Sequence, residues 1–151
     1  MKTKLYLAYG SNMDLEQMEW RCPDAEHRGV SEILDYQLLF KGSKTGSYAT
    51  IEPKEGSKVP VLVWEISERD EQSLDHYEGY PDFYQKQDFA VELDGHTVTA
   101  MAYVMDTGRP LGNPSSSYYY VLYRAYKAFG FDMNILKTAL DESANLIQNP
   151  C

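Results

Sequence analysis

A chain of 151 residues, 43% hydrophobic and 13% aromatic, has the composition of one globular domain, which we expect to span residues 1–151. The formal net charge is −9, and the few Lys and Arg residues are scattered. This argues against a nucleic-acid partner and against an anionic membrane, because both need a basic surface. The two cysteines form neither a CxxC pair nor a cluster with histidine, so the sequence predicts no metal and no redox cofactor.

The first part of the chain predicts a buried strand that leads into a helix. Residues 5–9 form an apolar run, and Gly10, Ser11 and Asn12 then predict a tight turn. Asn12 is the expected N-cap of a helix that ends near residue 22. Runs rich in β-branched, aromatic or other apolar residues predict three further strands, at residues 36–40, 48–52 and 59–66.

Helix and hairpin signals follow in the middle of the chain. Ser67 and Asp70 resemble a capping box with Asp in place of Glu, which predicts a helix that runs to about residue 77 and stops at Gly79. Asp94 and Gly95 separate two alternating runs and therefore predict a β-hairpin. Its strands are expected at residues 83–93 and 96–105.

The last third predicts two helices, one over residues 115–129 and one from an Asp132 cap to about residue 148. The second helix has an apolar stripe of six residues, Ile135, Leu136, Ala139, Leu140, Leu146 and Ile147. Strands thus dominate the first two thirds and helices the last third. This order predicts an α+β fold whose mainly antiparallel sheet closes into a small barrel.

Three segments contain residues suited to chemistry, and the first is residues 9–12. A glycine turn that leads into a helix N-terminus presents backbone N–H groups without partners. Such groups bind a carboxylate, or the oxyanion that forms in acyl transfer. An ordinary strand-to-helix turn capped by Asn12 would have the same pattern.

The second segment places Glu78 at the C-terminal end of its predicted helix. The helix dipole disfavours an anion there, and Asp75 on the same face adds a like charge. An apolar ring, from Tyr77 or from Tyr80, would also partly desolvate the carboxyl group. All three effects raise the pKa of Glu78 toward the value that a general base needs near neutral pH. The alternative is a solvated carboxylate at a helix end.

The third segment is a helix start, where Pro114 precedes three serines and Tyr118 falls in the first turn. A tyrosine there can bring its hydroxyl into a pocket while its ring packs on apolar neighbours. The neighbouring tyrosines also fit a packing stripe, which is the simpler role for most of them.

Four short motifs in this order resemble the γ-glutamylcyclotransferase family, which includes γ-glutamylamine cyclotransferases and the γ-glutamyl-removing enzyme of butirosin biosynthesis. They are Tyr-Gly-Ser-Asn after the first strand, Leu-Asp-x-x-Glu-Gly in mid-chain, a Tyr six residues after that Glu, and a late Pro-Ser-x-x-Tyr. The resemblance extends from about residue 4 to about residue 130. It implies a small mixed, mainly antiparallel β-barrel with flanking helices.

The resemblance also implies roles for particular residues and a reaction. Glu78 matches the family's catalytic glutamate. The substrate-binding residues that it implies are Tyr9, Gly10, Ser11, Asn12, Tyr84 and Tyr118. The substrate would be a small γ-glutamyl amide, cleaved by its own α-amine to 5-oxoproline and a free amine or amino acid. No cofactor and no metal are expected.

Two rival functions use the same residues differently. A non-catalytic module would bind a small γ-glutamyl-like or acidic metabolite in the same pocket. A hydrolase would need a covalent nucleophile, for which Ser11 and Cys22 are the candidates near the first turn. The N-terminus lacks the long apolar segment of a signal peptide, and no run has the length of a membrane span, so a cytoplasmic protein is expected.

Overall fold

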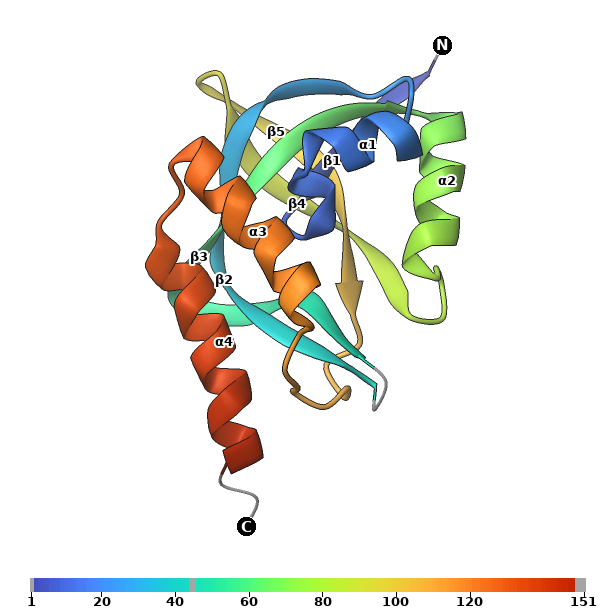
Figure 1. Cartoon of the computed structure of the whole chain (residues 1–151). Helices are drawn as coiled ribbons and strands as arrows, with labels where there is room; N and C mark the ends of the chain where they lie inside the picture. Colours follow the sequence, from blue (N-terminus) through green and yellow to red (C-terminus); the bar gives the residue numbers. More distant parts are fainter. Residues whose placement is uncertain (1, 44–45, 149–151) are drawn as a thin grey trace.

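The computed structural model describes residues 2–43 and 46–148, with side chains except at residues 43 and 144–148. It forms a mixed sheet with helices packed around it (Figure 1), which confirms the predicted α+β class. The strands are β1 (Thr3–Ala8), β2 (Glu26–Ser43), β3 (Gly46–Ser67), β4 (Tyr84–Leu93) and β5 (His96–Met105). They pair in the order β2-β3-β1-β5-β4, with β1 and β5 parallel and the other neighbours antiparallel.

The helices flank this sheet on different sides. They are the short 3-10 helix η1 (Ser11–Met13), α1 (Leu15–Arg21), α2 (Glu68–Glu78), α3 (Ser116–Phe129) and α4 (Met133–Gln148). In Figure 1, α3 and α4 lie together on one side of the molecule and α2 lies on the opposite side. Within the described residues, no helix has the combination of length and apolar character that crossing a bilayer requires.

Local capping signals decide where the helices begin. The predicted capping box is confirmed, because Ser67 Oγ accepts from the Asp70 N–H (3.1 Å) and Asp70 Oδ2 accepts from the Ser67 N–H (3.2 Å). The predicted Asn12 cap is wrong. Asp14 caps α1 and accepts from the Glu16 N–H at 3.0 Å, because η1 comes between β1 and α1. The side chain of Asn12 is therefore free for another role.

Strands β2 and β3 are much longer than the sequence pattern predicts. They pair over almost their full lengths as a bent ribbon that joins the predicted strands and includes the polar stretches around them. The register shifts near Gly29 and near Asp35, and both residues have positive φ, +147° and +62°. These bulges interrupt the alternation of apolar and polar residues, so a periodicity of two does not reveal the first half of β2.

The predicted closure of the sheet into a barrel is wrong. Within the described residues no backbone ladder joins the edge strands β2 and β4. Side chains cross the seam instead, where Ser31 Oγ donates to Glu92 O and Gln87 Nε2 donates to Tyr36 Oη (2.9 Å). The sheet curls far enough for these contacts, and the end of the β2 edge is covered by the loop before α3, where the Gly42 N–H donates to Pro110 O and the Gly112 N–H donates to Phe40 O.

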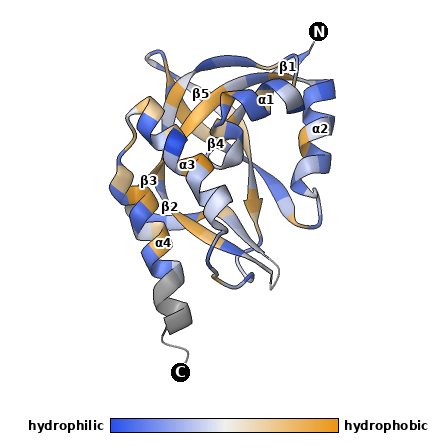
Figure 2. Ribbon diagram, in the orientation of Figure 1, coloured by the Kyte–Doolittle hydropathy of each residue, from blue (hydrophilic) through white to orange (hydrophobic). Residues whose placement is uncertain are grey.

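The core lies between the curled sheet and the two C-terminal helices. Tyr126 and Leu122 of α3 and Leu136 of α4 are fully buried and belong to one apolar cluster that includes residues of all five strands. Figure 2 shows a different pattern for α2, which is mostly hydrophilic and buries Leu74 and Asp70. The predicted apolar stripe of α4 is buried or partly buried from Ile135 to Leu140. The structure does not describe the side chains of Leu146 and Ile147, and Cys151 lies outside the described residues.

Candidate active site

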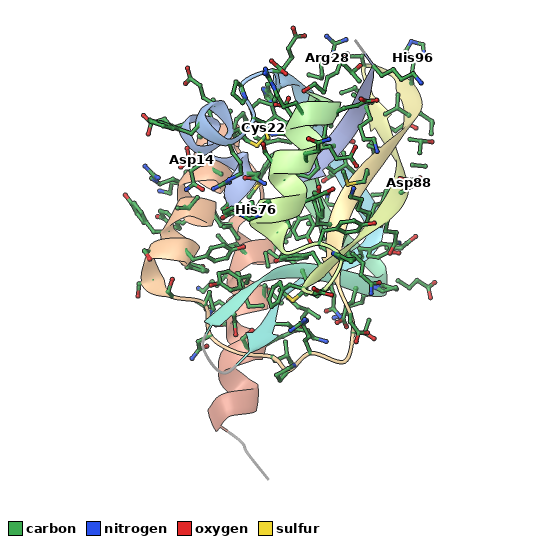
Figure 3. The ribbon with its side chains drawn as sticks, turned by 90° about the vertical axis from the view of Figure 1, so that its right-hand side faces the viewer. Asp14, Cys22, Arg28, His76, Asp88 and His96 are labelled. Carbon is green, nitrogen blue, oxygen red and sulfur yellow. The ribbon has the colours of Figure 1, made fainter. Side chains whose placement is uncertain are left out.

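Segments that are far apart in the sequence converge on one cavity of about 340 Å³. The turn after β1, the end of α2, the first turn of α3 and the starts of β3 and β4 form its walls. All seven residues singled out in the sequence line it: Tyr9, Gly10, Ser11, Asn12, Glu78, Tyr84 and Tyr118. Figure 3 views the molecule from the α2 side, with the cavity-lining His76 on α2 and with Asp14 and Cys22 at the two ends of α1 beside it. The size is that of a site for a small molecule.

Glu78 is the last residue of α2. Gly79 ends the helix in the left-handed conformation (φ +67°), and the Tyr80 N–H donates to Asp75 O at 2.9 Å. This tight end places the Glu78 carboxyl group on the wall of the cavity, with Oε1 3.4 Å from Asn12 Nδ2. The position needs glycine, because a side chain at the left-handed C-cap is strained.

Burial raises the pKa of Glu78 to about 7, and the charge of Arg21 opposes this shift. The expected contribution of Asp75 is not among the causes. Asp75 Oδ1 accepts from Tyr103 Oη at 2.6 Å, and Lys86 Nζ lies 3.0 Å from the same carboxylate oxygen. The carboxylate of Asp75 is thus bound by partners of its own, a phenol and an ammonium group. Glu78 is close to half ionised at neutral pH, which suits a group that takes up and returns a proton.

Asn12 is buried and forms hydrogen bonds to several residues around the site. Its Nδ2 donates to Tyr6 Oη at 2.8 Å and its Oδ1 accepts from the guanidinium of Arg21. Its backbone carbonyl accepts from Trp64 Nε1 at 3.2 Å. These bonds fix both the side chain and the backbone of the turn that follows β1, so the turn is rigid where it faces Glu78.

Gly10 allows a close approach within this turn. Its φ of −119° is open to any residue, but a Cβ built on it would lie 3.0 Å from Tyr118 Oη. That distance is shorter than van der Waals contact. The glycine is therefore needed for space, since a larger residue would displace the tyrosine from the cavity wall.

Two tyrosines of the site, Tyr84 and Tyr118, bind the main chain of one residue of β3, Ala49. Tyr84 Oη donates to Ala49 O at 2.7 Å, and Tyr118 Oη accepts from the Ala49 N–H at 3.0 Å. Burial raises the pKa of both phenols well above the usual value, so both hydroxyls are neutral. Among the described residues no acceptor takes the hydrogen of Tyr118 Oη, which leaves it available to a ligand.

The structure adds residues that the sequence did not reveal as part of the site. Tyr6 and Tyr103 line the cavity from β1 and β5. Tyr77, which was expected only as a ring beside Glu78, also lines the cavity and pairs with Ser11 through the two hydroxyl oxygens at 3.0 Å. Tyr6 lies in the apolar run that was predicted as a strand, but side chains alternate between the faces of a strand, so the run did not show that Tyr6 faces the site. Arg21 had no signal in the sequence either, because its contact with Asn12 depends on how α1 folds back over η1.

The described side chains contain no group of three His, Cys, Asp or Glu residues arranged to hold a metal ion. Cys22 is buried, its Sγ donates to Asp70 O at 3.7 Å, and burial raises the pKa of its thiol to about 12. A thiol with so high a pKa is a poor nucleophile near neutral pH. The cavity wall thus presents hydroxyl, amide and carboxyl groups.

An α+β fold with a desolvated glutamate in a tyrosine-lined cavity is the architecture of an enzyme that acts on a small molecule. Residues 6–123 match the family described as "Gamma-glutamyl cyclotransferase, AIG2-like", and the chain belongs to that family. It is 32% identical over 142 residues to the gamma-glutamylcyclotransferase of Bos taurus, which covers 88% of this chain and 75% of the relative. The Homo sapiens gamma-glutamylcyclotransferase is 31% identical over 138 residues, 85% of this chain and 73% of that protein.

A solved structure has the same fold. A gamma-glutamyl cyclotransferase superposes with a TM-score of 0.80 at 28% identity, over 91% of this chain and 86% of that chain. Together with the family match, this confirms the prediction that the chain is a γ-glutamylcyclotransferase-like enzyme.

Proposed function

We propose that this enzyme cleaves an L-γ-glutamyl amide and releases 5-oxoproline with a free amine or amino acid. The α-amine of the glutamyl group attacks its own γ-carbonyl carbon, a new C–N bond closes the five-membered ring, and the original amide C–N bond breaks. One proton moves from the attacking nitrogen to the leaving nitrogen. Cyclotransferase chemistry in general is supported by the family, whose named relatives are gamma-glutamylcyclotransferases.

Glu78 is the proposed carrier of that proton. The observation that carries this proposal is a carboxyl group on the wall of the cavity whose pKa burial raises to about 7. The α-amine attacks in its neutral form. As a carboxylate, Glu78 accepts the proton that this nitrogen loses as it bonds to the carbonyl carbon, and as a carboxylic acid it returns the proton to the leaving nitrogen. A pKa near the working pH allows both steps, whereas a fully solvated glutamate would be a weak base.

The turn after β1 is the proposed holder of the glutamyl group. Ser11 and Asn12 line the cavity, and their N–H groups, the first of η1, have no acceptor within the helix. They suit the α-carboxylate of the substrate, or the oxygen that gains negative charge when the carbonyl is attacked. The hydrogen of Tyr118 Oη is a further donor. Tyr9 and Tyr84 line the same wall and shape it.

The test is release of 5-oxoproline from a panel of γ-glutamyl amides with amino-acid, peptide and simple amine leaving groups. Glu78→Gln should fold normally and lose activity by roughly 10²- to 10⁴-fold, the usual contribution of general acid–base catalysis. Glu68→Gln is the matched control, because Glu68 is an exposed glutamate in the first turn of the same helix.

Each outcome separates the rival functions. Release by the wild type and by Glu68→Gln, but not by Glu78→Gln, supports the proposal and identifies the leaving group. Release of free glutamate instead of 5-oxoproline would indicate a hydrolase. Ligand binding without turnover for every member of the panel would favour a binding module for a small γ-glutamyl-like or acidic metabolite.

A further inference from the structure

Arg21 joins the two segments on which the proposed reaction depends. It is the last residue of α1, and its guanidinium donates through Nη1 to Asn12 Oδ1 and through Nη2 to Gln17 Oε1 (3.3 Å). Its Cζ atom lies 3.4 Å from the centre of the Tyr77 ring. Tyr77 immediately precedes Glu78, so one side chain contacts both the turn after β1 and the end of α2.

The first contact fixes the orientation of the Asn12 amide. Arginine has hydrogen-bond donors and no acceptor, so the oxygen of the amide must face Arg21 and the nitrogen must face the other way. On that side Nδ2 donates to Tyr6 Oη at 2.8 Å and lies 3.4 Å from Glu78 Oε1. A reversed amide would place its oxygen against the carboxylate and disfavour the ionised form of Glu78.

The second contact restrains the last turn of α2. A planar guanidinium stacks well on an aromatic ring, which lysine reproduces poorly. The same ring is tied at its other end, because Tyr77 Oη pairs with Ser11 Oγ at 3.0 Å. The cation also lowers the pKa of Glu78, against the effect of burial.

We propose that Arg21 is a positioning residue for the Glu78 acid/base, acting through the Asn12 amide and the Tyr77 ring. The inference rests on the proposed function, in which Glu78 transfers the proton. Arg21 itself is not part of the cavity wall. Its loss should therefore change the protonation and orientation of Glu78 more than the affinity for substrate.

The test compares Arg21→Met and Arg21→Lys by two measurements. The first is the pKa of Glu78, from NMR titration of protein labelled with carbon-13 at the glutamate carboxyl and assigned with Glu78→Gln. The second is the pH dependence of kcat/KM for 5-oxoproline release. Arg21→Met should raise the pKa by roughly half to one unit, since it removes a nearby opposite charge and the fixed amide donor. The acidic limb of the profile should move to higher pH by the same amount.

Arg21→Lys separates charge from geometry. Lysine keeps the charge but not the planar stack on Tyr77, so the pKa of Glu78 should stay near the wild-type value. The value of kcat should still fall roughly 10- to 100-fold, because a small displacement of a catalytic group has effects of this size. If Arg21→Met does not fold, this variant decides the question, since wild-type kcat in Arg21→Lys would overturn the proposal.

Arg124→Met is the matched control. Arg124 stacks on Tyr120 at 5.3 Å and binds Asp14, the N-cap of α1, at 3.2 Å, so it makes the same kinds of contact at the other end of α1. It should leave the pKa of Glu78 unchanged. An unchanged pKa in Arg21→Met, or an equal shift in Arg124→Met, would overturn the inference. The NMR titration needs no turnover. If the wild type released no 5-oxoproline, the proposed function would be contradicted, and the pKa of Glu78 in the Arg21 variants would still test the effect of Arg21 on Glu78.

Discussion

The two ends of α2 hold the same side chain in opposite electrostatic environments. Glu71, near the N-terminus, lies 2.7 Å from Lys86 of β4 and 3.0 Å from Lys4 of β1. Burial raises the pKa of Glu71, but the two lysines lower it by more, and the net shift is downward. Glu78, two turns later, loses water without a comparable cation, and its pKa rises to about 7.

The comparison shows that cations from the sheet lower the pKa of Glu71, whereas burial raises the pKa of Glu78 against the single opposing charge of Arg21. Both residues are glutamates on one helix of 11 residues, and the helix dipole favours an anion at the end near Glu71 and disfavours it at Glu78. The N-terminal half of α2 is anchored by the capping box and by ion pairs with two strands. The C-terminal end lines the cavity, and there the carboxyl group of Glu78 keeps its proton up to about pH 7.

The largest expected effect on stability comes from Glu78→Gln. The folded pKa of about 7 exceeds the usual value of 4.5, so between these pH values the unfolded state ionises while the folded state keeps its proton. Folding stability from this group is thus lost as pH rises, and the loss is complete above about pH 7. Glu78→Gln should raise the free energy of unfolding there by up to about 3 kcal/mol, with no gain below pH 4.5.

Urea denaturation of the wild type and of Glu78→Gln at pH 4 and pH 8 measures this difference. An equal effect at both pH values would mean that the Glu78 carboxyl group is not desolvated in the folded protein. The expected result links activity and stability directly, because the variant that abolishes turnover would be the more stable one at neutral pH.

Lys86→Met tests the other end of α2. The lysine binds both Glu71 and Asp75, and its ammonium group lies 4.2 Å from the centre of the Tyr80 ring. We expect a loss of about 1–2 kcal/mol at pH 7, between the values for exposed and buried pairs. The pKa of Glu71 is lowered in the folded state, so this stability is present above the usual pKa and disappears as pH falls through the folded value.

The matched control for Lys86→Met is Lys58→Met. Lys58 pairs with Glu32 at 3.0 Å, and both side chains are about half exposed, so its removal should have little effect on the free energy of unfolding. Similar losses in the two variants, or a loss in Lys86→Met that persists at pH 2, would show that the Glu71 cluster is no more stabilising than a surface pair.

Ser67→Ala should have the smallest effect. It removes the cap of α2 while both glutamates keep their neighbours, so we expect a loss of about 1 kcal/mol that is nearly independent of pH between 5 and 8. Thermal unfolding across this range measures it. A change in the pKa of Glu78 in this variant would contradict the view that the local environment, and not the integrity of the helix start, sets its titration.

Much of the fold could be predicted because its signals are local. The capping pair Ser67 and Asp70, the Asp94–Gly95 turn and the stop at Gly130 each depend on a few neighbouring residues, and each prediction agrees with the structure. The length of β2 and the open seam between β2 and β4 depend on bulges and on contacts between distant strands, so periodicity does not reveal them.

The candidate site shows the same division. The positions of Gly10, Glu78 and Tyr118 on the cavity follow the predicted motifs. The cause of the raised Glu78 pKa was predicted only in part, because desolvation acts as expected but Asp75 is not among the causes and instead binds Lys86 of β4. Asn12 was predicted as a helix cap, but the 3-10 helix η1 comes before α1 and the cap is Asp14. The side chain of Asn12 instead bonds to other residues of the site.

The bulges at Gly29 and Asp35 have a consequence for association between molecules. An unpaired edge strand offers a row of N–H and C=O groups to any other extended chain, which is a common start of aggregation. The two bulges bend the edge strand β2 and shift the register of its backbone hydrogen bonds. A straight strand of another molecule therefore cannot pair with β2 over its full length. Gly29 and Asp35, whose bulges prevent the recognition of β2 from the sequence, thus also hinder the pairing of this sheet edge with other copies of the chain.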